Sequence, residues 1–501
     1  MRDISRISIP ACALAAALSG CTLGPDFVAP QPDAPKDWTD TALPKNEAAS
    51  PFNAAFNTGP ADGAAWWDNF HDPILSSLVA RAAASNLDIR EAALRIAEAR
   101  TQTKIAAADQ WPTLGGNASY ARQGFSDTTA QGSLFNSVGN LGHGTGLAIP
   151  SFPNPYDQYQ VGFDASWEPD LFGAVRRSVE AANADTQASI EDSHDALVSL
   201  EGEVARTYID LRGAQLKLAV TKSNLATQRE AFVLARQRKQ AGLTTSIDVS
   251  NADAQVRSTR SQVPLLEREI AVDINQLSQL LAQAPGALRA ELVESRPVPA
   301  APRDIAIGLP ADLARRRPDI RASEARLHAA TAQIGVATAN LFPKISLDAS
   351  LGTQAEHPLD LTRWASRFFS LGPTLDVPIF EGGKLKATVH LADVREKEAA
   401  VDYARTVLAA LHDVENALIA YNTEVARHLD LEATAARNRE TLALARQRYR
   451  NGLTTFLEVL DAERSLQQTE LSLADSTASS ATDLVALYKA LGGGWQKVVP
   501  G

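Results

Sequence analysis

The sequence has few of the residues that form cross-links, metal sites and catalytic centres. Its 501 residues include only two cysteines and eight histidines. The histidines show no metal-ligand spacing, and no zinc-protease, nucleotide-binding or nucleophile motif is present, so we expect no enzyme, metal or cofactor. A formal net charge of −11 argues against nucleic acid as a partner. Beyond residue 21 no apolar run approaches the roughly 18 residues of a membrane helix, so only β-strands could span a bilayer.

The first 21 residues have the layout of a lipoprotein signal peptide. Arg2 and Arg6 precede an apolar stretch that is too short to span a bilayer, and Leu18-Ser19-Gly20-Cys21 follows it. We expect cleavage before Cys21, which would then carry a covalent lipid on its sulfur as an anchor. Cys12 would leave with the signal peptide, so no disulfide could form. Thr22 stands where an aspartate would retain a bacterial lipoprotein in the inner membrane.

The rest of the chain is a tandem duplication. Residues 234–243 read Leu-Ala-Arg-Gln-Arg-Lys-Gln-Ala-Gly-Leu, and residues 444–453 read Leu-Ala-Arg-Gln-Arg-Tyr-Arg-Asn-Gly-Leu, at an offset of 210. Residues 86–90 and 317–321 match at an offset of 231, so the first repeat holds about 21 extra residues between positions 113 and 170. A period this long indicates a duplicated half-protein and not a short solenoid repeat.

Each repeat is expected to contain a long helical hairpin. Residues 384–451 contain no Gly or Pro, and residues 174–241 contain only two glycines, so each segment predicts a helix of about 100 Å. Apolar residues at alternating spacings of four and three predict coiled-coil packing. In the second repeat these are Val407, Leu411, Val414, Leu418, Tyr421 and Val425. Gly242 and Gly452 then break the helices, and the chain returns on second helices.

Alternation of apolar and polar residues predicts four strands. It is clear at 159–168 and 345–351, continues near 369–377 and is weaker at 114–120. Strands of about ten residues with one apolar and one polar face suit a transmembrane barrel with a wet lumen. A soluble sandwich would alternate in the same way, but the lipoprotein signal and the flanking aromatic residues favour the barrel. Four strands cannot close a membrane barrel, which needs at least about eight, so we expect the chain to oligomerise.

These patterns divide the chain into six segments. They are the signal peptide 1–21, an extended strap 22–72, a first repeat 73–285, a linker 286–308, a second repeat 309–491 and a tail 492–501. The first repeat is expected to contain a helix at 73–109, a β-hairpin at 111–170 and a helical hairpin at 174–284. The second is expected to contain a helix at 310–340, a β-hairpin at 343–380 and a helical hairpin at 384–491. Two polar clusters are interpreted as structural. We expect His194-Asp195 to be a solvated pair on a helix face, and Arg315-Arg316-Arg317 to end a helix before Pro318.

These features together resemble the TolC-like outer membrane factors, specifically the NodT-type efflux outer membrane lipoproteins. The resemblance covers the whole mature chain. Its most specific motifs are Cys21-Thr22-Leu23-Gly24-Pro25-Asp26, Trp66-Trp67 with Phe70 and Asp72-Pro73, Leu309-Pro310 through Arg316-Arg317-Pro318-Asp319-Ile320, and the paired Gly-Leu-Thr tips. The implied fold is an α+β membrane protein, a homotrimer whose 12-stranded transmembrane β-barrel, with four strands per chain, continues into a 12-helix periplasmic α-helical barrel.

The resemblance also implies function, location and partners. The chain would be the outer membrane channel of a tripartite efflux system, held in outer membrane lipid and extending into the periplasm. It would passively conduct drugs or other small solutes, joined through a periplasmic adapter to an inner-membrane transporter of the resistance-nodulation-division type. Two alternatives stay open: the outer membrane duct of a type I protein secretion system shares the fold, and a surface lipoprotein with a coiled-coil stalk would need no pore.

The family's periplasmic gate transfers to this sequence by counting from the tip glycines. Six positions after Gly242 is Asp248, and three before Gly452 is Tyr449; in the relatives these positions hydrogen-bond across the two hairpins as a latch. Thr454 stands where some relatives have a basic residue, which implies a looser latch without that ion pair.

The resemblance places acidic rings and docking tips close to the same glycines. Glu458 and Asp461 lie six and nine positions after Gly452, where the relatives have carboxylates that face the lumen, and a spacing of three puts both on one helix face. A solvated charged face is the alternative for this pair. The tips Gly242-Leu243-Thr244 and Gly452-Leu453-Thr454 are expected to dock the adapter, because glycine permits the tight reversal.

Overall fold

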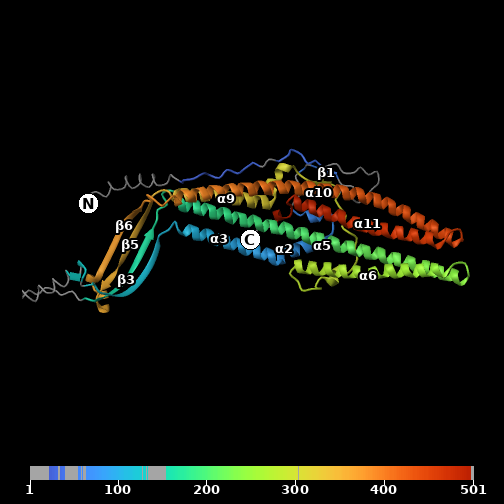
Figure 1. Ribbon diagram of the computed structural model, residues 1–501, viewed down its shortest axis with the longest axis horizontal. Coiled ribbons are helices and arrows are strands. Elements are labelled where there is room, and N and C mark those ends of the chain that lie inside the picture. The colour runs from blue at the N-terminus through green and yellow to red at the C-terminus, as the bar shows by residue number, and fades with distance from the viewer. Residues whose placement is uncertain are drawn as a thin grey trace, which may run out of the picture. The chain divides into compact units, whose positions relative to one another are not determined.

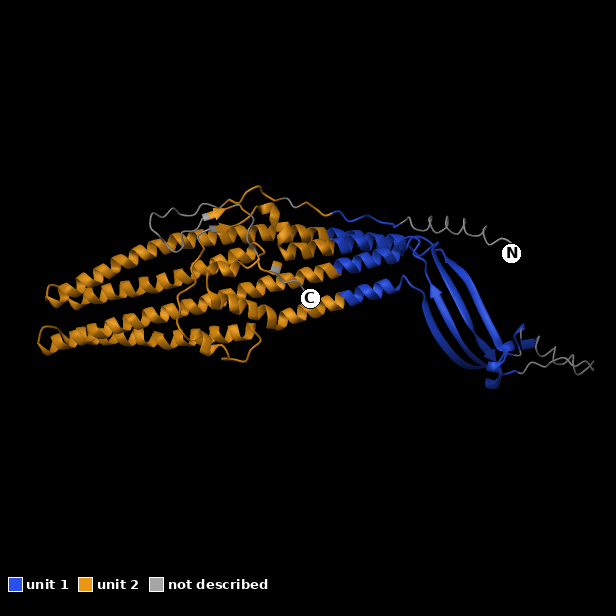
Figure 2. Cartoon of the chain, turned by 180° about the vertical axis from the view of Figure 1, so that it is seen from behind, with its two compact units in different colours: residues 1–28, 100–185, 328–398 blue, residues 29–99, 186–327, 399–501 orange. Residues whose placement is uncertain are grey.

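The computed structural model describes residues 22–31, 34–39, 55–57, 59, 64–126, 128–130, 132–133, 154–302 and 304–497. The predicted lipid-anchor residue Cys21 and most of the long loop between the first two strands lie outside these ranges. Two compact units are present (Figure 2). One comprises residues 1–28, 100–185 and 328–398, and the other comprises residues 29–99, 186–327 and 399–501.

The first unit contains a four-stranded antiparallel sheet in the order β2-β3-β5-β6. Its strands are β2 (Thr113–Gln123), β3 (Tyr156–Trp167), β5 (Lys344–Ala355) and β6 (Arg367–Asp376). The four strands predicted from alternation are therefore confirmed. They are joined into one sheet by the pairing of β3 with β5, which brings the two repeats together.

The register gives the sheet one apolar and one polar face. Leu114, Ala165, Ala349 and Leu371 lie across from one another on adjacent strands. Residues in the next row, Thr113, Ser166, Asp348 and Gly372, lie on the opposite face. On that face Ser166 donates a hydrogen bond to Asp348 at 2.7 Å. Among the described residues the apolar face is largely uncovered, since Leu114 is 75% exposed and Phe369 is 83% exposed.

Two helical hairpins dominate the second unit (Figure 1). The first pairs α5 (Ala174–Gln240) with α6 (Ser246–Leu280), and the second pairs α10 (Lys384–Arg450) with α11 (Phe456–Ala490). The duplication is confirmed by their lengths, because α5 and α10 each have 67 residues, and α6 and α11 each have 35. In the part of the chain that the structure describes, none of these long helices carries an apolar stretch sufficient to span a membrane.

The turns at the two hairpin tips have the same geometry. Gly242 and Gly452 both have a φ of 72°, a left-handed conformation that favours glycine. Leu243 N–H donates to the Arg238 carbonyl at 2.8 Å, and Leu453 N–H donates to the Arg448 carbonyl at 2.9 Å. These are Schellman caps, so a local rule ends both long helices in the same way.

The single helix predicted at the start of each repeat is wrong. The first repeat has α2 (Pro73–Ser85) and α3 (Leu87–Ala108), because the Asn86 side chain accepts hydrogen bonds from the N–H groups of Asp88 and Ile89 and starts a new helix. The second has α8 (Leu313–Arg316) and α9 (Pro318–Ala339), because Pro318 cannot continue α8.

Short elements close the second unit. The strap contributes β1 (Ala55–Asn57), which pairs in parallel with β4 (Asp304–Ala306) of the linker. The linker also contains α7 (Arg289–Leu292). The second unit also contains the 3-10 helices η1 (Trp66–Phe70), η2 (Pro310–Asp312) and η5 (Trp495–Lys497), whereas η3 (Pro358–Thr362) and η4 (Trp364–Ser366) belong to the first unit. The β1–β4 pair was not predicted, because three-residue strands carry too little alternation to be recognised.

Candidate functional site

The tips of the helical hairpins expose apolar side chains in two equivalent pairs. Leu243 and Ile247 are 65% and 69% exposed on the first hairpin, and Leu453 and Leu457 are 68% and 65% exposed on the second. Sequence reasoning selected the two leucines after the glycines but missed Ile247 and Leu457. Both lie one helical turn further along, at the same offset of 210 that relates the tips, and that repeat was the available signal.

Tyr449 lies inside the chain near the second tip. It is 3% exposed and packs edge-on against Phe456, with ring centroids 5.5 Å apart. Both belong to an apolar cluster that includes Ala235 and Ala252 of the first hairpin. Among the described residues, the Tyr449 hydroxyl has no hydrogen-bond partner. The ring therefore joins the two hairpins by burial and not through its hydroxyl.

Arg238 of α5 makes the polar contact with this part of α10. Its Nη1 donates to the carbonyl oxygens of Tyr449 at 2.9 Å and Arg450 at 3.1 Å. Its guanidinium carbon also lies 4.6 Å from the centre of the Tyr449 ring, a cation–π distance. Sequence reasoning missed Arg238, because an arginine in the last turn of a helix normally needs no explanation beyond the helix dipole.

The expected hydrogen bond between Asp248 and Tyr449 does not form within one chain. Asp248 instead accepts a hydrogen bond from Thr244, four positions earlier on its own hairpin. The tyrosine ring is turned into the apolar cluster beneath Arg238, so its hydroxyl does not reach the carboxylate. Thr454 lies half-buried beside this tip, and its hydroxyl also lacks a hydrogen-bond partner in the described ranges. The role of Asp248 and Tyr449 in a latch stays a prediction.

Glu458 and Asp461 are both exposed at the start of α11. Val459 and Leu460 between them and Ala462 after Asp461 face the chain's own core, with exposures of 1%, 2% and 7%. The two carboxylates therefore share the face of α11 that points away from that core, as the spacing predicted. Glu458 lies in the first turn of α11, where a negative charge is favoured by the helix dipole.

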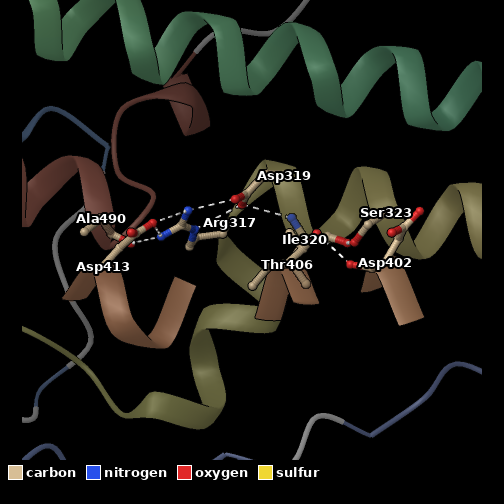
Figure 3. Close-up of polar contacts among 8 residues, drawn as sticks. All are labelled: Arg317, Asp319, Ile320, Ser323, Asp402, Thr406, Asp413 and Ala490. Carbon is tan, nitrogen blue, oxygen red and sulfur yellow. Dashed lines mark hydrogen bonds and ion pairs between the residues drawn. The ribbon is translucent and has the colours of Figure 1, made fainter. Parts of the chain in front are cut away.

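A second polar site surrounds Arg317, between α8 and α9 (Figure 3). Its guanidinium pairs with Asp319 at 2.7 Å and Asp413 at 3.1 Å, and donates to the Ala490 carbonyl at 3.1 Å. Arg315 and Arg316 do end a helix, as predicted, whereas Arg317 joins α9 to α10 and α11. The same residues line a cavity of about 440 Å³.

The prediction of a solvated His194-Asp195 pair is wrong. The His194 ring stacks on Trp495 of the tail at 4.6 Å, and Asp195 lines the Arg317 cavity. Burial raises the pKa of Asp195, and the neighbouring Asp319 raises it further. The tail that covers His194 is 300 positions away in the sequence, so helix periodicity could not reveal this contact. Within the described ranges, no group of three or more His, Cys, Asp or Glu side chains is placed to hold a metal ion.

An amphipathic sheet and two long helical hairpins with exposed apolar pairs at their tips are typical of a channel-type membrane protein. Comparison with known proteins identifies the family. The chain belongs to the Outer membrane efflux protein family, whose model matches residues 78–283 and 309–493.

Individual relatives match over nearly the full length. The chain is 32% identical to Nodulation protein T of Rhizobium leguminosarum bv. trifolii, covering 96% of each chain. It is 32% identical to Outer membrane protein OprJ of Pseudomonas aeruginosa, covering 98% of this chain and 96% of the relative. Among solved structures, the outer-membrane channel OprN matches with a TM-score of 0.82 and 34% identity over 95% of this chain and 100% of that one. A structure of CusC matches with a TM-score of 0.80 and 26% identity over 95% of this chain.

These likenesses confirm three predictions made from the sequence. The fold class is that of the outer-membrane channels, with strands and helical hairpins built from a duplicated half. The protein is the outer membrane component of an efflux system. Its location is the outer membrane.

Proposed function

We propose that three copies of this chain form a passive duct for drugs or other small solutes. The observation that carries this proposal is the four-stranded sheet with one apolar and one polar face. In the part of the chain that the structure describes, its apolar face is exposed, and its two edge strands, β2 and β6, have no further strand partner. Three sheets of four strands would form a barrel of twelve strands, above the minimum of about eight, with the apolar face against lipid and the polar face in the lumen.

The periplasmic gate in this proposal is an acidic ring. Three chains would present Glu458 and Asp461 as six carboxylates around the pore, which attract cations. Asp248 and Tyr449 would act on the same constriction from the hairpin ends. Because Tyr449 is buried and Asp248 is bonded to Thr244 in the chain, each would have to move or meet a second chain to form a latch.

The partners in this proposal are a periplasmic adapter and an inner-membrane transporter of the resistance-nodulation-division type. The exposed apolar pairs Leu243 with Ile247 and Leu453 with Leu457 give the adapter a small hydrophobic contact at each tip. The energy for transport would come from the transporter, because a passive duct catalyses no reaction that could supply it.

We also propose that Cys21 carries a lipid anchor close to the sheet. Support comes from the residues that follow it. Leu23 N–H donates to the Phe172 carbonyl at 3.2 Å, and the buried Arg177 pairs with Asp26 at 2.7 Å. These contacts hold the chain just after the proposed anchor against the start of α5.

Single-channel recording in planar bilayers tests the duct and its gate together. In this proposal the resting tips are closed, so the wild-type trimer should conduct weakly. Glu458→Ala combined with Asp461→Ala should lower cation selectivity and weaken block by multivalent cations, with a modest change in resting conductance. A trimer that never conducts would contradict the duct and favour a non-conducting stalk. Unchanged selectivity in the double variant of a conducting trimer would show that the gate lies elsewhere.

A further inference from the structure

The duplicated tip motif is used differently in its two copies. Arg238 and Arg448 are equivalent, since each lies four positions before its tip glycine in the shared run Leu-Ala-Arg-Gln-Arg. Arg238 is half-buried and crosses to the other hairpin, whereas Arg448 is exposed. Identical local sequence has therefore produced one bridging arginine and one solvated arginine.

Arg238 donates hydrogen bonds to carbonyl oxygens at the C-terminal end of α10. The last carbonyl oxygens of an α-helix have no partner within the helix and carry partial negative charge. Arg238 of α5 donates from Nη1 to two carbonyls at the end of α10, that of Arg450 and that of Tyr449, which also accepts a hydrogen bond from the Gly452 N–H at 3.0 Å. One side chain of the first hairpin thus caps the long helix of the second, and its guanidinium also covers the Tyr449 ring at 4.6 Å.

This contact lies next to the proposed gate. Tyr449 packs on Phe456, which is the first residue of α11, and Glu458 follows two positions later. The position of α11 at its start therefore depends on how firmly the end of α10 is held. A second arginine, Arg446, also crosses between hairpins by donating to the Thr227 carbonyl at 3.1 Å, but it is tied to the buried Glu463 as well.

We propose that Arg238 is a clasp that holds the second hairpin against the first in the resting channel, and that opening requires its release. This proposal rests on the gate described under Proposed function. Arg238 is a positioning residue in it, since it acts on the carboxylates of α11 through Tyr449 and Phe456. Arg446 is unsuited to a test, because its removal would leave Glu463 buried without its cation.

The test compares Arg238→Ala with Arg448→Ala in reconstituted trimers. Both variants remove one arginine from the same motif, and only the first removes the clasp. Loss of a hydrogen bond between a charged donor and a carbonyl should shift the closed–open balance by about ten-fold, so Arg238→Ala should raise the resting open probability by about that factor. Arg448→Ala should keep the wild-type value. Trimer assembly is checked by heat-modifiable migration in gels.

A second pair of variants tests the same proposal if Arg238→Ala does not assemble. Arg238→Lys keeps a cation, but an ammonium cannot hold two carbonyls and cover a ring in the way a planar guanidinium does. It should also raise the open probability above that of Arg448→Lys. Assembled Arg238 variants that match their Arg448 controls in resting conductance would overturn the clasp. A wild-type trimer that never conducts would instead contradict the duct itself, so the two failures are distinguishable.

Discussion

Replacing Glu201 by Gln should reduce the pH dependence of stability. Glu201 of α5 is 2% exposed, and burial raises the pKa of its carboxyl from an ordinary 4.5 to about 8. One carboxyl oxygen has no hydrogen-bond partner in the described ranges, and it lies where a Cβ on Gly494 would be. The neutral acid is therefore the form that fits beneath the C-terminal turn.

The direction of the effect follows from proton binding. Between pH 4.5 and pH 8 the folded chain keeps this proton while the unfolded chain loses it, so the folded state is favoured at low pH and loses stability as pH rises through that window. From pH 5 to pH 7 the loss amounts to about 2–3 kcal/mol per chain. Gln cannot ionise, so the variant should lack this contribution.

Thermal unfolding of the detergent-solubilised trimer, followed by circular dichroism between pH 5 and pH 8, measures this dependence. Glu201→Gln should have a flatter profile than wild type and gain most in relative stability near pH 8. Glu230→Gln, at an exposed position on the same helix, is the matched control and should follow wild type. The reasoning is refuted if Glu201→Gln retains the wild-type slope while the control behaves as expected.

Three further predictions concern the membrane, the adapter and the anchor. Phe369→Arg, on the apolar face of the sheet, should destabilise the inserted barrel by up to about 2–4 kcal/mol if that position lies near the bilayer centre, and should lower the amount of assembled outer-membrane protein. Ser370→Arg, on the opposite face, should assemble and change the conductance. Leu243→Asp combined with Leu453→Asp should abolish complementation of a pump-deficient strain while trimers still assemble, and undiminished drug resistance would count against docking at the tips. Cys21→Ser should accumulate as an uncleaved or mislocalised precursor, because acyl burial supplies about 0.8 kcal/mol per CH₂ of membrane attachment, and mass spectrometry of the wild-type N-terminus should find the lipid.

Local patterns predicted most of the elements but not their small interruptions. The Gly-free run from 384 to 451 predicted α10 almost to its last residue, and alternation located all four strands. The break at Asn86 was missed, because an asparagine that ends one helix and caps the next looks like an ordinary polar helix residue until its hydrogen bonds are seen. The break at Arg317 was indicated by Pro318, which follows it, although a single helix over 310–340 was also expected.

The functional residues were likewise predicted where local sequence decides their position and missed where a distant contact decides it. Glu458 and Asp461 were selected by position and do share an exposed face, because two residues three apart on a helix must do so. The latch pair was not reproduced within a chain, since the partner of Asp248 depends on which neighbour is nearer, and Thr244 is on the same turn. Asp195 was assigned to solvent, because nothing near it in the sequence indicates that the tail returns to cover His194.

The sequence by itself determined the helix lengths, the strand faces and the two glycine turns, since each of these depends on residues within a few positions of one another. It also revealed the duplication, because the two copies match at a fixed offset. The tertiary structure alone decided that Arg238 bridges the hairpins and Arg448 does not. The local sequence around these arginines is nearly the same, and both tips have the same cap. The difference lies in the partner, because the carbonyl that Arg238 binds is 211 positions away, and only packing of the two hairpins brings it within 2.9 Å.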